Sequence, residues 1–190
     1  MTTAISEKAR FRSEARARRR AFVASLDDER RAELQAALAA NALPLLDGAT
    51  VVASYAPMGG EIDPAALADA LHRSGRSIVL PWFQSRTAAM RFRRAGILEP
   101  GPFGTLQPVA SEPLMTPDAV LAPLVAADRR CDRLGQGEGH FDRCLAGLRE
   151  GGLKIAVGLA WDAQVVDVLP VDSWDQRLDA VATPSRVIRP

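Results

Sequence analysis

The segment that decides the fold reads "ATVVASYAPMGGEIDPAALADALHRSGRSIVLPWF" and covers residues 49–83. It begins with an apolar run rich in β-branched residues, which is typical of a strand. Asp63 and Pro64 then predict the start of a helix, because Asp is favoured as a cap and Pro at the first helical position. Gly75 predicts the end of that helix, and a second strand follows at 76–83. A strand, a helix and another strand in this order indicate an α/β protein.

The rest of the chain continues the same alternation. Short apolar runs predict strands at 90–94, 118–126 and 154–161, and residues 141–152, "FDRCLAGLREGG", have the pattern of a helix. The Pro- and Gly-rich piece at 96–117 is interpreted as a long surface connection. We therefore predict an α/β fold, a single-domain open, largely parallel sheet flanked by helices. In such a sheet a ligand binds at the carboxyl ends of the strands.

Basic N-terminal helices are expected at about 6–46, ahead of the first strand. In the first of them Phe11, Ala15 and Phe22 share one seam. A neighbouring stripe of cations at helical spacing consists of Lys8, Arg12, Arg16 and Arg19. The second helix is expected to begin at Asp27 or Asp28, where a carboxylate favours the positive end of a helix. The stripe is either a solvated face or a surface that binds an anion.

Composition excludes several classes of protein. A chain of 190 residues that is 47% hydrophobic and 25% charged fits one globular domain. With 24 basic and 23 acidic residues, the net charge of +1 gives no overall attraction to nucleic acid or to an anionic membrane. The longest uncharged apolar run, at 119–127, is far shorter than the roughly 18 residues that a spanning helix needs. We expect a cytoplasmic monomer with no nucleic-acid or membrane partner.

The stretch "RLGQGEGHFDRCL" at 133–145 has a glycine at every second position before a predicted helix. It fits neither the Rossmann fingerprint nor the Walker loop. Glycines expose backbone N–H groups, and the start of the helix adds its positive dipole end, so the two together form a cradle for an anion. Arg133 supplies a cation suited to phosphate, while Asp142 either caps the helix or binds Mg²⁺. A phosphate site with a metal is favoured over a glycine-rich surface turn.

On these motifs the chain resembles the 5-formyltetrahydrofolate cyclo-ligase family, also called methenyltetrahydrofolate synthetase. The resemblance rests on Lys8 and Arg12, on "GGEID" at 59–63, on the glycine-rich stretch and on "LPVDSWDQRLDAV" at 169–181. It implies a single cyclo-ligase-like domain over residues 1–190. It also implies an ATP- and Mg-dependent conversion of 5-formyltetrahydrofolate to 5,10-methenyltetrahydrofolate. In that reaction the formyl oxygen is phosphorylated, and ADP and phosphate are released.

The resemblance further implies roles for individual residues. Lys8, Arg12 and Arg133 would be catalytic, through contact with the ATP phosphates. ATP would be bound by Lys8, Arg12, Arg133, Leu134, Gly135, Gln136, Gly137, Glu138, Gly139, His140 and Phe141. The reduced folate would be bound by Tyr55, Ala56, Met58, Glu61, Trp82, Phe103, Gln136 and His140, with Glu61 accepting hydrogen bonds from the pterin. Asp142 and Asp175 would bind Mg²⁺. For Trp82 and Phe103, packing in the core is the alternative.

The sequence departs from the family pattern at several positions. Cys131 and Asp132 replace a glycine-containing turn, and Trp174 replaces a residue that is more often polar. Glu138 stands where a small or basic residue is common. Because a carboxylate near phosphates is repulsive, we expect its side chain to point to solvent or toward a cation. His140 replaces an aromatic residue, and it either stacks as one or caps the helix.

Two functions of other classes are considered beside the enzyme. A relative that has lost catalysis would bind folate or nucleotide as a sensor or interaction module. RNA binding by the Arg-rich helix is disfavoured, because the basic stripe lacks interleaved aromatic residues and the net charge is close to zero. An assay for the methenyl product distinguishes the enzyme from the sensor.

Overall fold

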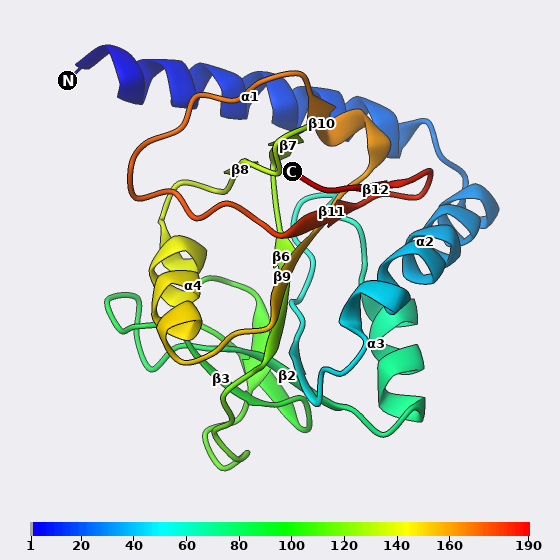
Figure 1. Ribbon diagram of the computed structural model, residues 1–190, viewed down its shortest axis with the longest axis vertical. Helices are drawn as coiled ribbons and strands as arrows, with labels where there is room; N and C mark the ends of the chain where they lie inside the picture. The colour runs from blue at the N-terminus through cyan, green and yellow to red at the C-terminus, as the bar shows by residue number, and fades with distance from the viewer. Residues whose placement is uncertain (1) are drawn as a thin grey trace.

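A seven-stranded sheet forms the centre of the computed structural model, which describes residues 2–190, with side chains from Glu7 onward (Figure 1). Its strands are β1 (Val51–Ala53), β2 (Ser77–Trp82), β3 (Arg91–Arg94), β6 (Ala119–Pro123), β9 (Ile155–Leu159), β11 (Ala180–Ala182) and β12 (Val187–Ile188). They lie in the order β12-β11-β9-β6-β1-β2-β3. The five central strands are parallel, whereas the edge strands β3 and β12 are antiparallel to their neighbours.

Helices cover both faces of this sheet. They are α1 (Thr2–Ala24), α2 (Asp28–Ala42), α3 (Ala65–Arg73) and α4 (His140–Glu150), with short 3₁₀ helices η1 (Leu43–Leu46) and η2 (Asp162–Gln164). Figure 1 shows α2 and α3 on one face and α4 on the other. Leu38, Leu67 and Leu71 belong to the core on the first face, and Leu145 of α4 belongs to the core on the second. The predicted single-domain open sheet flanked by helices is confirmed.

The helix starts follow the predicted chemistry closely. The Asp27 side chain accepts a hydrogen bond from the Arg30 backbone N–H at 2.7 Å, so Asp27 is the cap of α2. Pro64 is the N-cap of α3 rather than its first residue, and an Asp63 oxygen accepts from the Ala65 N–H at 2.9 Å. The α3 helix therefore begins one residue later than expected.

Two predictions about the middle of the chain are wrong. The predicted strand at 118–126 is divided, because β6 ends at Pro123 and the chain then enters a separate sheet. That sheet has the order β10-β7-β8 and consists of β7 (Ala126–Asp128), β8 (Arg133–Leu134) and β10 (Val165–Val166). Residues on both sides of the break are buried, so hydrophobicity does not reveal it.

The predicted surface connection at 96–117 contains an antiparallel hairpin of β4 (Leu98–Pro100) and β5 (Leu106–Pro108). Gln107 attaches this hairpin to the end of β2. Its side chain accepts from the Phe83 N–H at 3.1 Å and donates to the Phe83 carbonyl at 3.2 Å. Proline is tolerated on such edge strands, which is why a proline-rich composition did not exclude them.

The topology leaves a crevice at one edge of the sheet. From β1 the chain passes through α3 to β2 on one side, and it later returns to β6 on the other side of β1. The strand order thus reverses between β1 and β6, and an open α/β sheet binds its ligands at the carboxyl ends of strands at such a point.

The α1 helix lies across this edge (Figure 1). Phe11 and Ala15 pack against Val125, Ala126, Leu134 and Leu169, and the Phe22 ring lies 5.7 Å from that of Trp161. The predicted apolar seam is therefore the docking face of the helix. No helix in the described part of the chain is both long enough and apolar enough to cross a membrane.

At the opposite edge, Asp118 joins the starts of three parallel strands. Its carboxylate accepts from the backbone N–H groups of Thr50 and Val51, each at 3.0 Å, and from the Lys154 ammonium at 2.9 Å. Although partial burial acts in the other direction, these hydrogen bonds lower the pKa of Asp118 from 3.8 to about 2. The ionised carboxylate consequently stabilises the folded state.

We predict that Asp118→Asn removes part of the acid sensitivity of folding. A carboxyl group whose pKa is lower in the folded state contributes stability above its unfolded pKa, and that stability is lost as pH falls. For Asp118 the loss takes place between pH 3.8 and about 2. Urea unfolding at pH 7, 4 and 2.5 should show a smaller decrease for the variant than for the wild type. Equal decreases in both proteins would contradict this role.

Candidate functional site

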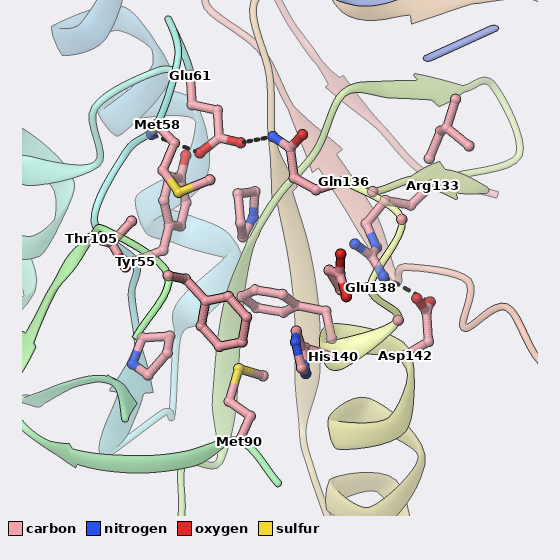
Figure 2. A pocket seen from close by; sticks show the side chains of 18 of the residues that line it. Tyr55, Met58, Glu61, Met90, Thr105, Arg133, Gln136, Glu138, His140 and Asp142 are labelled. Carbon is pink, nitrogen blue, oxygen red and sulfur yellow. Dashed lines mark hydrogen bonds and ion pairs between the residues drawn. The ribbon is translucent and has the colours of Figure 1, made fainter. Parts of the chain in front are cut away.

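A cavity of about 400 Å³ opens where β1, β2 and β6 end (Figure 2). Its walls come from the loop after β1, the end of β2 with the β4–β5 hairpin, the glycine-rich stretch before α4, the C-terminal loop, and α1. Of the predicted site residues, it brings together Lys8, Arg12, Tyr55, Ala56, Met58, Glu61, Phe103, Asp175 and every residue from Arg133 to Asp142. Residues far apart in the sequence therefore meet in one cleft.

The alternating glycines have separate structural causes. A Cβ atom at position 135 would lie 2.9 Å from the Arg133 guanidinium, so a side chain there would displace Arg133 from its present position. Gly137 has φ +117° and Gly139 has φ +66°, both in the left-handed region that glycine adopts without steric cost. The Arg12 guanidinium lies over Gly137 and donates from Nε to the Gly135 carbonyl at 3.0 Å. The loop is thus curled beneath two cations.

Asp142 pairs with Arg133 and does not cap its helix. The Arg133 guanidinium donates to Asp142 Oδ1 at 2.7 Å, and the Arg133 side chain is 3% exposed. Gly139 is the N-cap of α4, without a side-chain cap. The same Asp142 oxygen accepts from the Gln176 backbone N–H at 3.2 Å, which brings the residue next to Asp175 beside Asp142. The cap alternative for Asp142 is therefore wrong.

Lys8 reaches the C-terminal loop. Its ammonium donates to Asp172 at 2.6 Å and to Asp175 at 2.5 Å. Burial acts to lower the pKa of Lys8, but the hydrogen bonds and charges of the two aspartates outweigh it and raise that pKa. Lys8 is buried, as is Arg19, so the cationic stripe of α1 is not a solvated face. Asp172 was not predicted, because its role depends on a pairing across the whole chain.

Glu61 lies at the other end of the cleft (Figure 2). One of its oxygens accepts from the Met58 N–H at 3.0 Å, and the other accepts from the Gln136 side chain at 2.9 Å. Burial raises the pKa of Glu61, while these hydrogen bonds and the Arg19 charge act to lower it. Gln136 links this carboxylate directly to the glycine-rich stretch.

An aromatic group forms the wall between these two ends. The rings of Phe83, Phe103 and His140 contact one another edge to face, with centroids 4.8 to 5.0 Å apart. Burial, followed by the charge of Arg143, lowers the pKa of His140 and favours a neutral ring. His140 therefore packs as an aromatic residue. Arg143 donates to its Nδ1 at 3.2 Å.

Trp82 does not lie among the described residues that line the cleft. It is buried, and the Arg93 guanidinium lies 4.2 Å from its ring centroid. The neighbouring Phe83 lines the cleft instead. Successive strand residues point to opposite faces, so the prediction was wrong by one position. The cleft residues that sequence reasoning missed are Pro81, Phe83, Met90, Pro102, Thr105, Leu106, Gln107, Pro123, Asp172 and Trp174.

Glu138 is exposed beside the glycines. The side chain of Arg143 donates to the Glu138 backbone carbonyl at 2.9 Å rather than to its carboxylate. Its exposure agrees with part of the expectation for a carboxylate in this loop, although Glu138 also lines the cleft and forms no ion pair with a described cation.

Comparison with known proteins identifies the family. Residues 4–184 match the sequence profile of the 5-formyltetrahydrofolate cyclo-ligase family. This chain belongs to that family. The 5-formyltetrahydrofolate cyclo-ligase of Escherichia coli K12 is 34% identical over 186 residues, which cover 90% of this chain and 97% of the relative. The cyclo-ligase of Mycolicibacterium smegmatis is 32% identical over 153 residues, covering 75% of this chain and 77% of the relative. As a cyclo-ligase, the chain is an enzyme of the ATP-dependent ligase class.

Solved structures give the same result for the fold. The NMR structure of the Aquifex aeolicus 5,10-methenyltetrahydrofolate synthetase is similar with a TM-score of 0.78 and 28% identity, covering 96% of this chain and 92% of that one. The Mycoplasma pneumoniae synthetase has a TM-score of 0.71 and 20% identity over 94% and 99% of the two chains, so it supports the fold alone.

We predict opposite stability effects for two glycines next to and within α4. Gly139→Ala should lower the free energy of unfolding by about 1 kcal/mol, because its left-handed φ of +66° disfavours a side chain. Gly147→Ala, at an exposed helical position with open space around it, should raise it by roughly 0.5–1 kcal/mol. Urea unfolding at pH 7 measures both. A Gly139→Ala protein as stable as the wild type would contradict the loop conformation.

Proposed function

We propose that this cyclo-ligase converts 5-formyltetrahydrofolate to 5,10-methenyltetrahydrofolate, using ATP with Mg²⁺ and releasing ADP and phosphate. The observation that carries the proposal is the pairing of two unlike ends in one cleft. A glycine-rich loop beneath Arg12 and Arg133 suits phosphates, and the buried carboxylate of Glu61 suits a pterin. The family and its relatives are named for the same folate conversion, which supports this substrate.

The pterin is proposed to bind at the Glu61 end. A pterin carries neighbouring N–H donors on its pyrimidine ring, and an ionised carboxylate accepts two such hydrogen bonds strongly. Glu61 lines the cleft and already accepts from the side-chain amide of Gln136, another cleft residue, so a pterin N–H would take the place of a donor of the same kind. The edge-to-face group around Phe83 and Phe103 supplies an apolar wall for the flat ring system.

The triphosphate is proposed to bind over the glycine-rich loop. Exposed backbone N–H groups and the N-terminus of α4 favour negative charge there. Arg12 and Arg133 lie at this loop, and Lys8 lies at the C-terminal loop beside it. These three cations would oppose the charge that develops on the transferred phosphoryl group.

Asp142 and Asp175 fit a magnesium ion bound together with phosphates. Mg²⁺ prefers oxygen ligands and commonly takes one or two carboxylates plus substrate phosphates. The Gln176 N–H bond places the two aspartates on adjoining segments, although each is paired with a cation, Arg133 or Lys8. When bound, the metal ion would neutralise phosphate charge. Lys8 and Arg133 would then exchange their carboxylate partners for phosphate oxygens.

The bond changes require both ligands side by side. The formyl oxygen attacks the γ-phosphorus of ATP, an O–P bond forms, and the bond to ADP breaks. The N10 amine of the folate then attacks the formyl carbon and loses its proton, and the C–O bond breaks as phosphate leaves. The chain contributes positioning and charge, since Glu61 orients the pterin while the cations orient the triphosphate.

The direct test is the absorbance of the conjugated methenyl product after Mg-ATP is added to protein and 5-formyltetrahydrofolate. Product that depends on ATP, with ADP released in equal amount, supports the proposal. Tight binding of both ligands without product would instead indicate the sensor, and the proposed function would be wrong.

We predict that Arg12→Ala weakens the binding of ATP more than the binding of folate. Its guanidinium lies over Gly137 and donates to the Gly135 carbonyl, where the triphosphate is proposed to bind. A charge-assisted contact is worth about 1.5–3 kcal/mol, so the Michaelis constant for ATP should rise about tenfold or more. The matched control is Arg18→Ala, an exposed arginine of the same helix. Equal rises for both ligands would place Arg12 elsewhere in the mechanism.

We also predict that Glu138→Gly keeps turnover and lowers the Michaelis constant for ATP modestly. The side chain is exposed and its carboxylate opposes a polyanion, so its removal relieves repulsion. Solvent screening keeps the gain small. Steady-state kinetics at low and high salt measures it. Lost turnover in a folded variant would assign Glu138 an active role.

A further inference from the structure

Arg19 is a buried cation just behind the pterin end of the cleft. The residue is 3% exposed, and its guanidinium lies 3.7 Å from Glu61 Oε1, where the Glu61 side chain is 4% exposed. It donates one hydrogen bond, to the Leu124 carbonyl at 3.3 Å. Within the described chain its Nε has no partner, and Arg19 is not among the residues that line the cleft.

This arrangement is poorly explained by stability alone. Burial lowers the pKa of Arg19, with Glu61 acting in the opposite direction, so the charged form is held in an unfavourable environment. A buried ion pair without full hydrogen bonding offsets little of its desolvation cost. The contact at 3.7 Å is an ion pair rather than a close hydrogen bond. We therefore consider how the charge of Arg19 affects Glu61.

Several groups around Glu61 oppose the effect of burial on its pKa. Burial raises its pKa, and the groups that oppose this are the Met58 N–H, the Gln136 amide and Arg19, of which only Arg19 carries a full charge. Tyr55 packs nearby as a neutral phenol whose hydroxyl donates to the Ile62 carbonyl at 2.8 Å. Asp63, on the same loop, adds a negative charge that acts on Tyr55.

Arg16 orients the side-chain amide of Gln136, the uncharged partner of Glu61. Its guanidinium donates to the Gln136 side-chain oxygen at 2.7 Å and to the Gln136 carbonyl at 3.1 Å. With the amide oxygen occupied, the NH₂ group of Gln136 faces Glu61 at 2.9 Å. Two arginines of α1 thus support one carboxylate, one directly and one through Gln136.

We propose that Arg19 is a positioning residue for the folate, which holds the Glu61 carboxylate ionised and fixed in direction from outside the cleft. The inference rests on the proposed function, since it takes the pterin as the ligand of Glu61. An ionised carboxylate accepts two hydrogen bonds, whereas a protonated one presents a donor to the donors of the pterin. Without Arg19, the affinity for folate should therefore decrease at mildly acidic pH.

The test measures the dissociation constant of 5-formyltetrahydrofolate without ATP, between pH 5 and pH 8, for Arg19→Met and Arg19→Lys. Without Arg19 the pKa of Glu61 rises, so affinity should begin to fall at a pH about one unit higher than in the wild type, which is about a tenfold loss at the acidic end. The loss should be smaller at pH 8, where Glu61 is ionised. Arg19→Lys retains the charge and should restore most of the wild-type profile.

Two controls separate positioning from a general structural effect. Arg18→Met removes an exposed arginine of the same helix and should leave the profile unchanged. In a Glu61→Gln background, Arg19→Met should add no further loss of folate affinity. A loss that is equal at every pH, or that persists in the Glu61→Gln background, would overturn the proposal. Circular dichroism verifies folding, and the uncharged polar variant Arg19→Gln carries the same test if Arg19→Met does not fold.

The outcome is distinguishable from failure of the proposed function. A wild-type protein that binds folate with the expected pH profile but forms no methenyl product would refute the reaction and leave the role of Arg19 intact. If the wild type forms the methenyl product but Arg19→Met has the same pH profile of folate affinity as the wild type, the reaction is supported and the role of Arg19 is refuted.

Discussion

The docking of α1 across the carboxyl edge of the sheet is the constraint on which the site depends. Phe11 and Ala15 pack against the cluster at the three-stranded β10-β7-β8 sheet, and this contact fixes the rotation of the helix about its axis. With the rotation fixed, Lys8 meets the C-terminal loop, Arg12 meets the glycine-rich loop, and Arg19 meets Glu61. One helix outside the sheet therefore joins the three parts of the cleft wall.

The fold could be predicted because its signals are local. In residues 49–83 the apolar runs and the residues that begin and end the helix lie within one short segment. The parallel strand-helix-strand unit that starts with β1 is therefore recognisable from this segment alone. The break after Pro123 and the hairpin after Gly96 were not recognisable, because burial continues through the first and proline is compatible with an edge strand in the second. Local composition does not record which sheet a buried strand joins.

The site divides in the same way. Glu61 and the glycines at 135, 137 and 139 belong to short motifs, and the structure brings them into one cleft. Arg19 and Asp172 act through partners that are distant in the sequence, so the cationic stripe and the motif at 169–181 contain them without indicating which residues they contact. Phe83 rather than Trp82 lines the cleft, because neighbouring residues of a strand point to opposite faces of the sheet. Near the end of a strand, sequence alone does not determine which of two neighbours faces the ligand.

The contacts of Lys8 have a consequence for synthesis of the chain. Lys8 is separated from Asp172 by 164 residues and from Asp175 by 167. During translation α1 emerges long before its acidic partners and before Leu169, which packs against its apolar seam. Through most of translation this helix carries unpaired cations beside an uncovered apolar face, the kind of surface that chaperones protect. A ribosome-bound fragment lacking the C-terminal loop is missing the part of the cleft wall that Asp172, Trp174 and Asp175 supply.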